Sequence, residues 1–151
     1  MLDDLKKSLI SILLVMSFSL SASNAQEIFI NEMMSSNSKF YFDEDGDDSD
    51  WIEIYNNTSS PINLLGYCLS DKAKQLEQWH FPDTTISAYG YLVVFASNKD
   101  RAIRGQELHA NFAISAAGED LFLTFDGEIV HKLPAIELQS NHSYGLFPDG
   151  S

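Results

Sequence analysis

Trp51-Ile52-Glu53-Ile54-Tyr55 has the clearest strand pattern in the sequence. Its pattern repeats every two residues, so Ile52 and Ile54 point to the same face of an extended strand. An amphipathic helix would need a period of about 3.6 residues, which these residues do not show. A run of turn-forming residues follows at once over 56–61, in which Pro61 restricts φ. The stretch therefore predicts a short strand that ends in a turn.

Short extended segments of the same kind recur along the rest of the chain. Turn-forming residues separate them about every 8–12 positions, and Asp126-Gly127 has the composition of a tight hairpin turn. This arrangement is typical of an all-β protein, an antiparallel β-sandwich. Besides residues 51–55, we expect strands over 27–33, 62–64, 67–70, 78–81, 91–96, 108–112, 121–125, 129–132 and 143–146.

The predicted core draws on most of these strands. Residues 91–96 are continuously apolar, which is typical of a central strand buried on both faces. Residues 98–105 are expected to form a loop with one turn of helix. The side chains expected to fill the sandwich are Ile28, Ile30, Ile52, Ile54, Leu69, Leu92, Val94, Leu121 and Leu123.

Residues 1–25 have the pattern of a cleavable secretory signal peptide. Lys6 and Lys7 precede an apolar run over residues 9–20, and small residues occupy the two positions that determine cleavage before Gln26. An uncleaved membrane anchor is the alternative, but a transmembrane helix needs roughly 20 apolar residues. We therefore expect a secreted, periplasmic or cell-surface protein, with residues 26–151 as one domain and no membrane insertion after cleavage.

Charge and cysteine content restrict the possible partners and the compartment. The chain of 151 residues has a formal net charge of −13, which would repel the phosphates of nucleic acid and of anionic membranes. Cys68 is the single cysteine, so no intrachain disulfide can form. An exported domain without a disulfide fits a bacterial envelope or secreted protein better than a eukaryotic extracellular one.

The segment Asp43–Asp50 concentrates six carboxylates in eight residues. Ca²⁺ is bound by six to eight oxygen ligands, and alternating Asp residues around a glycine turn supply such oxygens. The predicted calcium ligands are Asp43, Asp45, Asp47 and Asp50. The segment is not an EF-hand, because its glycine and its twelfth residue, Ile54, do not fit that loop. A solvated acidic loop without metal is the alternative.

We find no convincing catalytic constellation in the sequence. Glu32 and Glu53 flank the acidic segment, and they could act as acid and base, lend oxygens to the metal, or accept backbone N–H bonds. The last role is favoured, because no nucleophile is recognisable nearby. The S-x-x-K match at residues 36–39 lacks its partner motifs, and no Cys–His pair is evident. No zinc spacing links the histidines, each expected half-exposed on a strand: His80, His109, His131 and His142.

Several segments, taken in order, resemble the lamin-tail domain in its bacterial, secreted form. The resemblance covers nearly all of residues 27–151, and the order and spacing of the segments carry it more than any single motif. The matching segments are residues 30–33, 45–46, 50–56, 63–71, 79–82, 91–96, 109–112, 115–119 and 143–145.

This resemblance implies an immunoglobulin-like β-sandwich without catalytic residues. In bacteria, similar modules occur on exported multidomain proteins, sometimes beside kinase-like, nuclease or phosphatase domains. The heptad rod, the nuclear-localisation cluster and the C-terminal prenylation cysteine of nuclear lamins have no counterpart in this sequence. The fold is therefore carried over, and the cell biology of lamins is not.

Three functional hypotheses follow from the sequence. The leading hypothesis is a non-catalytic interaction module that binds a protein or a glycan, with the acidic segment ordered by calcium. The second is an accessory domain of a longer exported enzyme whose catalytic part lies beyond Ser151. The third, a hydrolase, requires Glu32 and Glu53 to face one open pocket.

Overall fold

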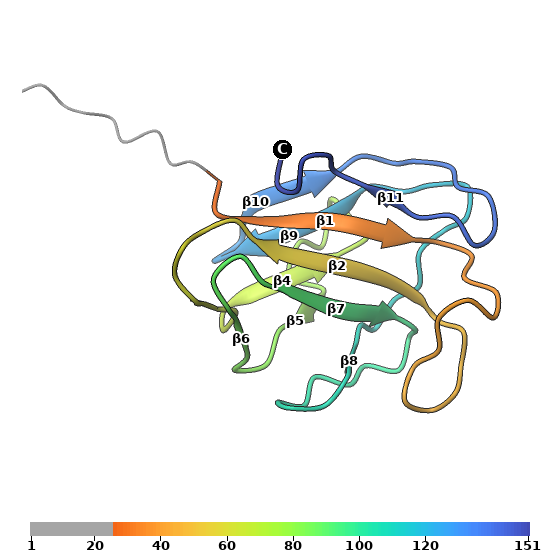
Figure 1. Ribbon diagram of the computed structural model, residues 1–151, viewed down its shortest axis with the longest axis horizontal. Helices are drawn as coiled ribbons and strands as arrows, with labels where there is room; N and C mark the ends of the chain where they lie inside the picture. The colour runs from red at the N-terminus through yellow and green to blue at the C-terminus, as the bar shows by residue number, and fades with distance from the viewer. Residues whose placement is uncertain (1–25) are drawn as a thin grey trace, which may run out of the picture.

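The computed structural model describes residues 26–151 (Figure 1). The predicted signal peptide, residues 1–25, lies outside the described residues. Within residues 26–151 there is no helix that is long and apolar enough to cross a membrane.

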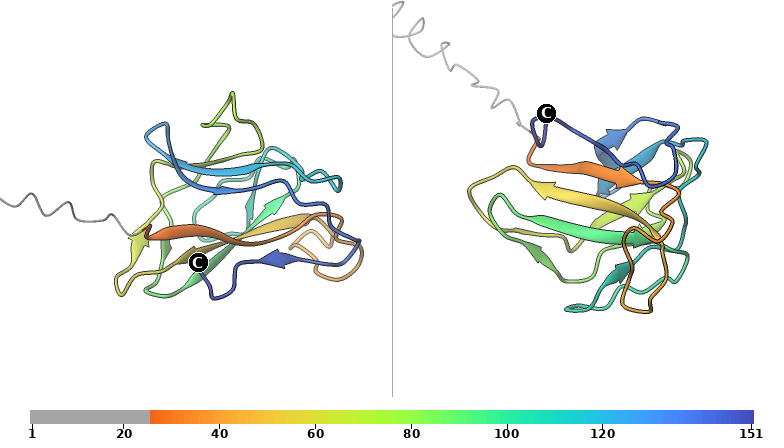
Figure 2. Two further views of the ribbon diagram at one scale, coloured as in Figure 1. Left: turned by 90° about the horizontal axis from the view of Figure 1, so that it is seen from above. Right: turned by 45° about the vertical axis from the view of Figure 1, so that its right-hand side comes forward.

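The described part of the chain is an all-β sandwich, as the sequence predicts. The larger sheet has the strand order β11-β1-β2-β7-β8, and the second has the order β10-β9-β4-β5. Figure 2 shows the two sheets as separate layers, with the C-terminal segment on the outer side of the larger sheet. The larger sheet contains β1 (Ile28–Met34), β2 (Asp50–Asn56), β7 (Tyr91–Ala96), β8 (Leu108–His109) and β11 (Tyr144–Gly145). The second sheet contains β4 (Tyr67–Ser70), β5 (Trp79–His80), β9 (Leu121–Phe125) and β10 (Glu128–Leu133), while β3 (Ile62–Asn63) and β6 (Thr85–Ile86) pair separately.

Strand β2 lies between β1 and β7, and its alternation divides the sheet into two faces. Ile54 pairs with Ile30 on one side and with Leu92 on the other, and this row points inward. Glu53 pairs with Glu32 and with Val93, and that row points outward. The inner face packs against the second sheet, so the hydrophobic core lies between the layers.

The predicted core is largely confirmed, and the prediction for β7 needs correction. Eight of the nine expected core side chains are buried, and Leu92 is half-buried against them. Strand β7 is buried on both faces only over Val94–Ala96, whereas Tyr91 is exposed and Val93 is half-buried. Among the described residues, Tyr41 and the C-terminal segment cover only parts of the outer face of this sheet, and an apolar sequence cannot reveal which parts.

The connections differ from expectation in two places. No helical turn is assigned within residues 98–105, and Arg101 instead forms an isolated bridge with His109. Strand β8 pairs with β7 in parallel, which makes it an exception in an otherwise antiparallel fold. These connections bring residues 97–109 to the same end of the sheet as the acidic segment before β2.

His131 of β10 joins the two sheets through the backbone of β1. The register of β1 shifts between Ile30 and Glu32, and that of β10 shifts between Ile129 and His131. Beside these bulges, the Ile30 N–H donates a hydrogen bond to His131 Nδ1 at 3.0 Å. The imidazole also meets the Phe29 ring edge-on, with 5.3 Å between ring centres. A histidine side chain thus satisfies a strand N–H that would otherwise lack a partner.

The hydrogen bond requires neutral His131, so stability should depend on pH. Burial lowers the pKa of His131, which means that the unfolded chain takes up a proton more readily than the folded one. The stabilisation is therefore complete above about pH 6.5 and is lost as pH falls through the lowered pKa of the folded state. Burial lowers the pKa of His109 in the same direction.

We predict that His131→Ala lowers the free energy of unfolding by about 1–3 kcal/mol at pH 8, because the Ile30 N–H loses its acceptor. His131→Asn retains an acceptor oxygen near the position of Nδ1 and should lose less. Urea unfolding at pH 8 and pH 5.5 measures both effects, with exposed His142→Asn as control. If the free energy of unfolding falls by the same amount between pH 8 and pH 5.5 in the wild type and in His131→Asn, His131 does not have this role.

Candidate functional site

The acidic segment folds into a tight loop around the carboxylate of Asp43. Gly46 has a φ of +81°, a value that glycine adopts without strain, and its N–H donates to the Asp43 carbonyl at 2.9 Å. Asp43 Oδ1 accepts hydrogen bonds from the backbone N–H groups of Asp45 and Asp47, each at 3.0 Å. Ser49 Oγ donates to Asp43 Oδ2 at 3.0 Å. The only buried carboxylate of this segment is therefore the one that organises its backbone.

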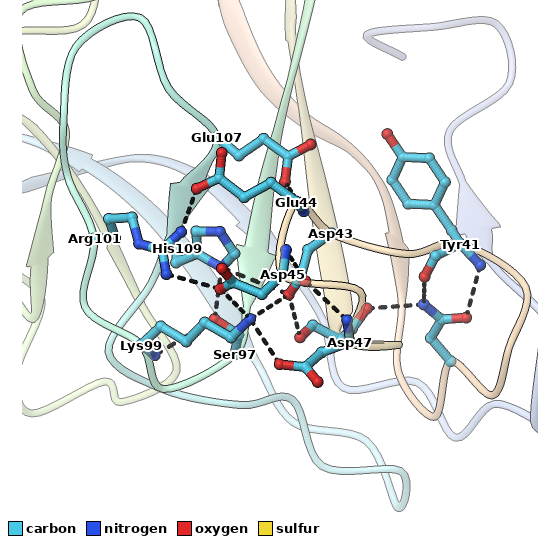
Figure 3. A network of polar contacts seen from close by, with 12 residues as sticks. Tyr41, Asp43, Glu44, Asp45, Asp47, Ser97, Lys99, Arg101, Glu107 and His109 are labelled. Carbon is cyan, nitrogen blue, oxygen red and sulfur yellow. Dashed lines mark hydrogen bonds and ion pairs between the residues drawn. The ribbon is translucent and has the colours of Figure 1, made fainter.

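The ammonium group of Lys99 lies at the point where three of the predicted calcium ligands converge (Figure 3). Its Nζ is 2.7 Å from Asp43, 2.8 Å from Asp45 and 2.9 Å from Asp47. Arg101 pairs with Asp45 at 2.8 Å and also with Glu44. The loop thus has two cationic side chains supplied from residues that follow β7.

Asp50, the fourth predicted ligand, points elsewhere. Its carboxylate accepts a hydrogen bond from the Asn37 N–H at 3.0 Å. The Asn37 side chain in turn donates to the Ser49 carbonyl at 2.9 Å and to the Tyr41 carbonyl. Asp50 therefore fixes the neighbouring loop, and the structure brings together only Asp43, Asp45 and Asp47.

The shifted pKa values follow from this arrangement. Burial alone would raise the pKa of Asp43, but hydrogen bonds from Lys99, the Asp47 backbone and Ser49 outweigh it and lower that pKa to about 2. Burial likewise opposes the charge of Lys99, and its hydrogen bonds to the three carboxylates outweigh this and raise its pKa. Both partners of the central ion pair are therefore charged at neutral pH.

His109 lies directly behind this loop and is fully buried, contrary to the expectation of a half-exposed histidine. Its ring stacks on Phe95 with 5.3 Å between centres, because β8 packs beside β7. Its Nδ1 is 2.9 Å from Ser97 Oγ and 4.0 Å from Asp43 Oδ2. Asp43, Asp45 and His109 place one ligand atom each within 4.8 Å of one another, which is close enough to hold a metal ion. Burial, followed by the charges of Arg101 and Lys99, lowers the pKa of His109.

Glu32 and Glu53 lie opposite each other on the outer face of the larger sheet. The Asn31 amide donates to Glu53 Oε1 and to Asp149 Oδ1, both at 3.1 Å. Burial, outweighing the Asn31 hydrogen bond, raises the pKa of Glu53, and the charges of Glu32 and Asp149 raise it further. Two surface grooves lie elsewhere among residues 26–151, one of about 430 Å³ beside Glu77 and His80 and one of about 490 Å³ beside Lys74 and Gly127. Neither Glu32 nor Glu53 lines either of them.

Cys68 and His80 form a pair that sequence reasoning missed. They face each other across β4 and β5, with 3.2 Å between Sγ and Nδ1. Burial and the charge of Glu77, only partly offset by a hydrogen bond with Thr124, raise the pKa of the thiol. The thiol therefore stays protonated and is no activated nucleophile. Twelve positions separate the two residues, so only the register of the hairpin identifies them as neighbours.

The outer face of the larger sheet leaves one band of side chains accessible, which we call the outer strip: Tyr41, Trp51, Glu53, Tyr91 and Val93. Tyr91 is 49% exposed and Tyr41 is 44% exposed. Tyr91 stacks on Tyr55, and Tyr41 stacks on Phe95. The strip thus presents two aromatic surfaces that pack against the sheet on one side and face solvent on the other.

Two comparisons with known proteins bear on this site. The family model described as Lamin Tail Domain matches residues 21–136 of the chain. The matched segment includes the acidic loop and every strand from β1 to β10. A comparison with curated proteins found no match.

Proposed function

Because the chain belongs to the lamin tail domain family, whose immunoglobulin-like members are generally non-catalytic, we propose that it is a binding module of an exported protein. The observation that carries this proposal is the outer strip, where Tyr41 and Tyr91 are held rigidly yet exposed. Rigid aromatic side chains are enriched at recognition surfaces, because they offer large contact areas at low entropic cost. The proposed ligand class is a protein or a glycan.

An accessory role in a longer exported enzyme is the second candidate. The carboxylates of Glu32 and Glu53 face outward together, and the raised pKa of Glu53 is compatible with an acid. However, Asn31 already holds Glu53, and the Cys68 thiol stays protonated. These contacts favour a binding role for this domain, whatever other domains accompany it.

If the protein is a binding module, it should retain its ligand saturably and should not convert that ligand chemically. The purified protein, immobilised, should retain a component of the extracellular protein or polysaccharide fraction of its source, and free protein should compete for it. Tyr91→Ala should reduce retention several-fold, while the exposed Phe125→Ala in the other sheet should not. Hydrolysis of a test glycan or phosphoester by the protein, abolished by Glu53→Gln, would contradict a non-catalytic module.

We also propose that the acidic loop responds to calcium, with Lys99 as the competing internal cation. Asp43, Asp45 and Asp47 already converge on one positive charge, so Ca²⁺ would have to displace the Lys99 ammonium to use the same oxygens. This geometry implies weak calcium binding in the wild type. Removal of the lysine charge should make the three carboxylates more available to a metal ion, although Asp45 keeps its ion pair with Arg101.

The variant Lys99→Met tests this competition. Without calcium, it should lower the free energy of unfolding by about 1–3 kcal/mol, since the Asp43 carboxylate loses its cation. Millimolar Ca²⁺ should then raise the melting temperature of Lys99→Met more than that of the wild type. Lys74→Met, which changes an exposed lysine outside any ion pair among the described residues, is the control. The calcium proposal is refuted if calcium does not raise the melting temperature of Lys99→Met. It is also refuted if the rise remains after Asp45 and Asp47 are both changed to Asn.

Export remains a proposal that rests on residues 1–25. The basic and apolar pattern predicts cleavage after Ala25, so the mature protein should begin with Gln26. N-terminal sequencing of the protein from fractionated cells checks this directly. An intact Met1 on protein recovered from the cytoplasm would disprove both cleavage and export.

A further inference from the structure

The outer strip has a regular construction that its sheet register explains. Outward-facing side chains of β1, β2 and β7 form three cross-strand rows. On β2 and β7 each step from one row to the next is two residues, or about 7 Å along a strand, whereas the bulge in β1 adds one residue between Phe29 and Glu32. The two outer rows are aromatic-rich and the middle row carries the carboxylates. The rows are Phe29–Tyr55–Tyr91, Glu32–Glu53–Val93 and Met34–Trp51–Phe95, of which Phe29, Tyr55, Met34 and Phe95 are buried and support the accessible side chains of the strip.

The two ends of the strip are aromatic surfaces. At one end, the rings of Tyr55 and Tyr91 stack with 4.7 Å between centres, and the Tyr91 hydroxyl donates to Asp149 Oδ2 at 2.5 Å. At the other end, Tyr41 stacks on Phe95 at 5.6 Å and meets Trp51 edge-on at 6.4 Å. These contacts fix the rings of Tyr91 and Tyr41 while one side of each stays open to solvent.

The carboxylates between these surfaces have no cationic partner within residues 26–151. Among the described residues, none of Glu32, Glu53 and Asp149 forms an ion pair. Strands β1, β2, β7 and β11 and residues 146–151 contain no lysine and no arginine. The acidic loop, by contrast, receives both Lys99 and Arg101. The aromatic face therefore presents a local excess of negative charge that the fold leaves unneutralised.

The combination of exposed aromatic rings and unneutralised carboxylates indicates which kind of ligand the outer strip binds. We propose that the outer strip binds an extended cationic polypeptide segment, with an arginine or lysine over Glu53 and flanking cations against Tyr91 and Tyr41. Guanidinium groups pair with carboxylates and stack on aromatic rings, so one residue type satisfies both parts of the strip. Alternate side chains of an extended peptide repeat about every 7 Å, which matches the spacing of the rows. The inference rests on the binding function proposed above and specifies its partner.

A glycan is the competing occupant, because sugar rings also pack on exposed tyrosines. Neutral sugars would leave Glu32, Glu53 and Asp149 without a counter-charge, whereas a cationic segment supplies one. The raised pKa of Glu53, caused first by burial and then by Glu32 and Asp149, is in keeping with that local excess of negative charge. The negative charge of the outer strip thus favours a cationic peptide over a neutral glycan.

Calorimetric titration of the purified protein tests the inference in 150 mM salt, which screens non-specific attraction. The probes are a blocked octapeptide of alternating Arg and Ser, the same peptide with citrulline for arginine, and chitotetraose. The arginine peptide should bind, and Glu53→Gln or Tyr91→Ala should weaken it at least tenfold. Matched controls in the other sheet, Glu128→Gln and Phe125→Ala, should change the affinity less than twofold.

The remaining outcomes overturn the inference in distinguishable ways. Equal weakening by the control variants would show only general attraction to an acidic protein. Equal binding of the uncharged citrulline peptide would show that positive charge is not required, and it would reject the cationic occupant. Chitotetraose binding that depends on Tyr91, without peptide binding, would reject the cationic occupant and leave the binding module intact. Failure of all three probes would reject the cationic segment, while the retention experiment above would still decide the proposed function.

Discussion

The structure depends on one constraint, the position of β2 between β1 and β7 with strictly alternating side chains. Ile52 and Ile54 are fully buried against the second sheet, and Glu53 between them must therefore point outward. The same alternation places Trp51 and Tyr55 on the outer side. A shift of one residue would exchange the two sets, so burial of the core and composition of the outer strip are fixed together.

The two groups of carboxylates in this acidic protein are treated differently by the fold. In the loop before β2, Asp43 is buried, and hydrogen bonds and the Lys99 ion pair compensate for its charge. On the outer face, Glu53 and Asp149 share the Asn31 amide and receive no cation within the described residues. Paired charges stabilise a loop, whereas unpaired charges beside exposed aromatic rings favour a binding role. The contrast explains why the outer strip, and not the most acidic segment, is the better candidate for recognition.

The sequence was sufficient for the fold class and for most of the core, because alternation and turn residues are local properties. It was insufficient wherever distant segments meet. Nothing local connects Lys99 to Asp43, since parallel pairing of β8 with β7 and the loop between them bring the two together. The same pairing buries His109. The apolar run in β7 suggested burial on both faces, which holds only for Val94–Ala96, because a sequence does not show which part of a sheet face is covered by other segments.

The candidate site shows the same division between local and long-range information. The alternation of the aspartates is local, but the convergence of Asp43, Asp45 and Asp47 on the Lys99 ammonium and the direction of Asp50 toward Asn37 depend on other loops. Cys68 and His80 meet only through hairpin register. The role of calcium stays a prediction, and Lys99 gives it a specific competitor.

Amide chemical shifts measured by NMR during addition of the arginine peptide show whether the outer face of the larger sheet is the recognition surface. We expect the perturbed amides to cluster on β2 and β7, around Glu53, Val93 and Tyr91, and those of β9 and β10 to stay unchanged. Perturbations centred instead on the groove beside His80 and Glu77 would contradict this expectation.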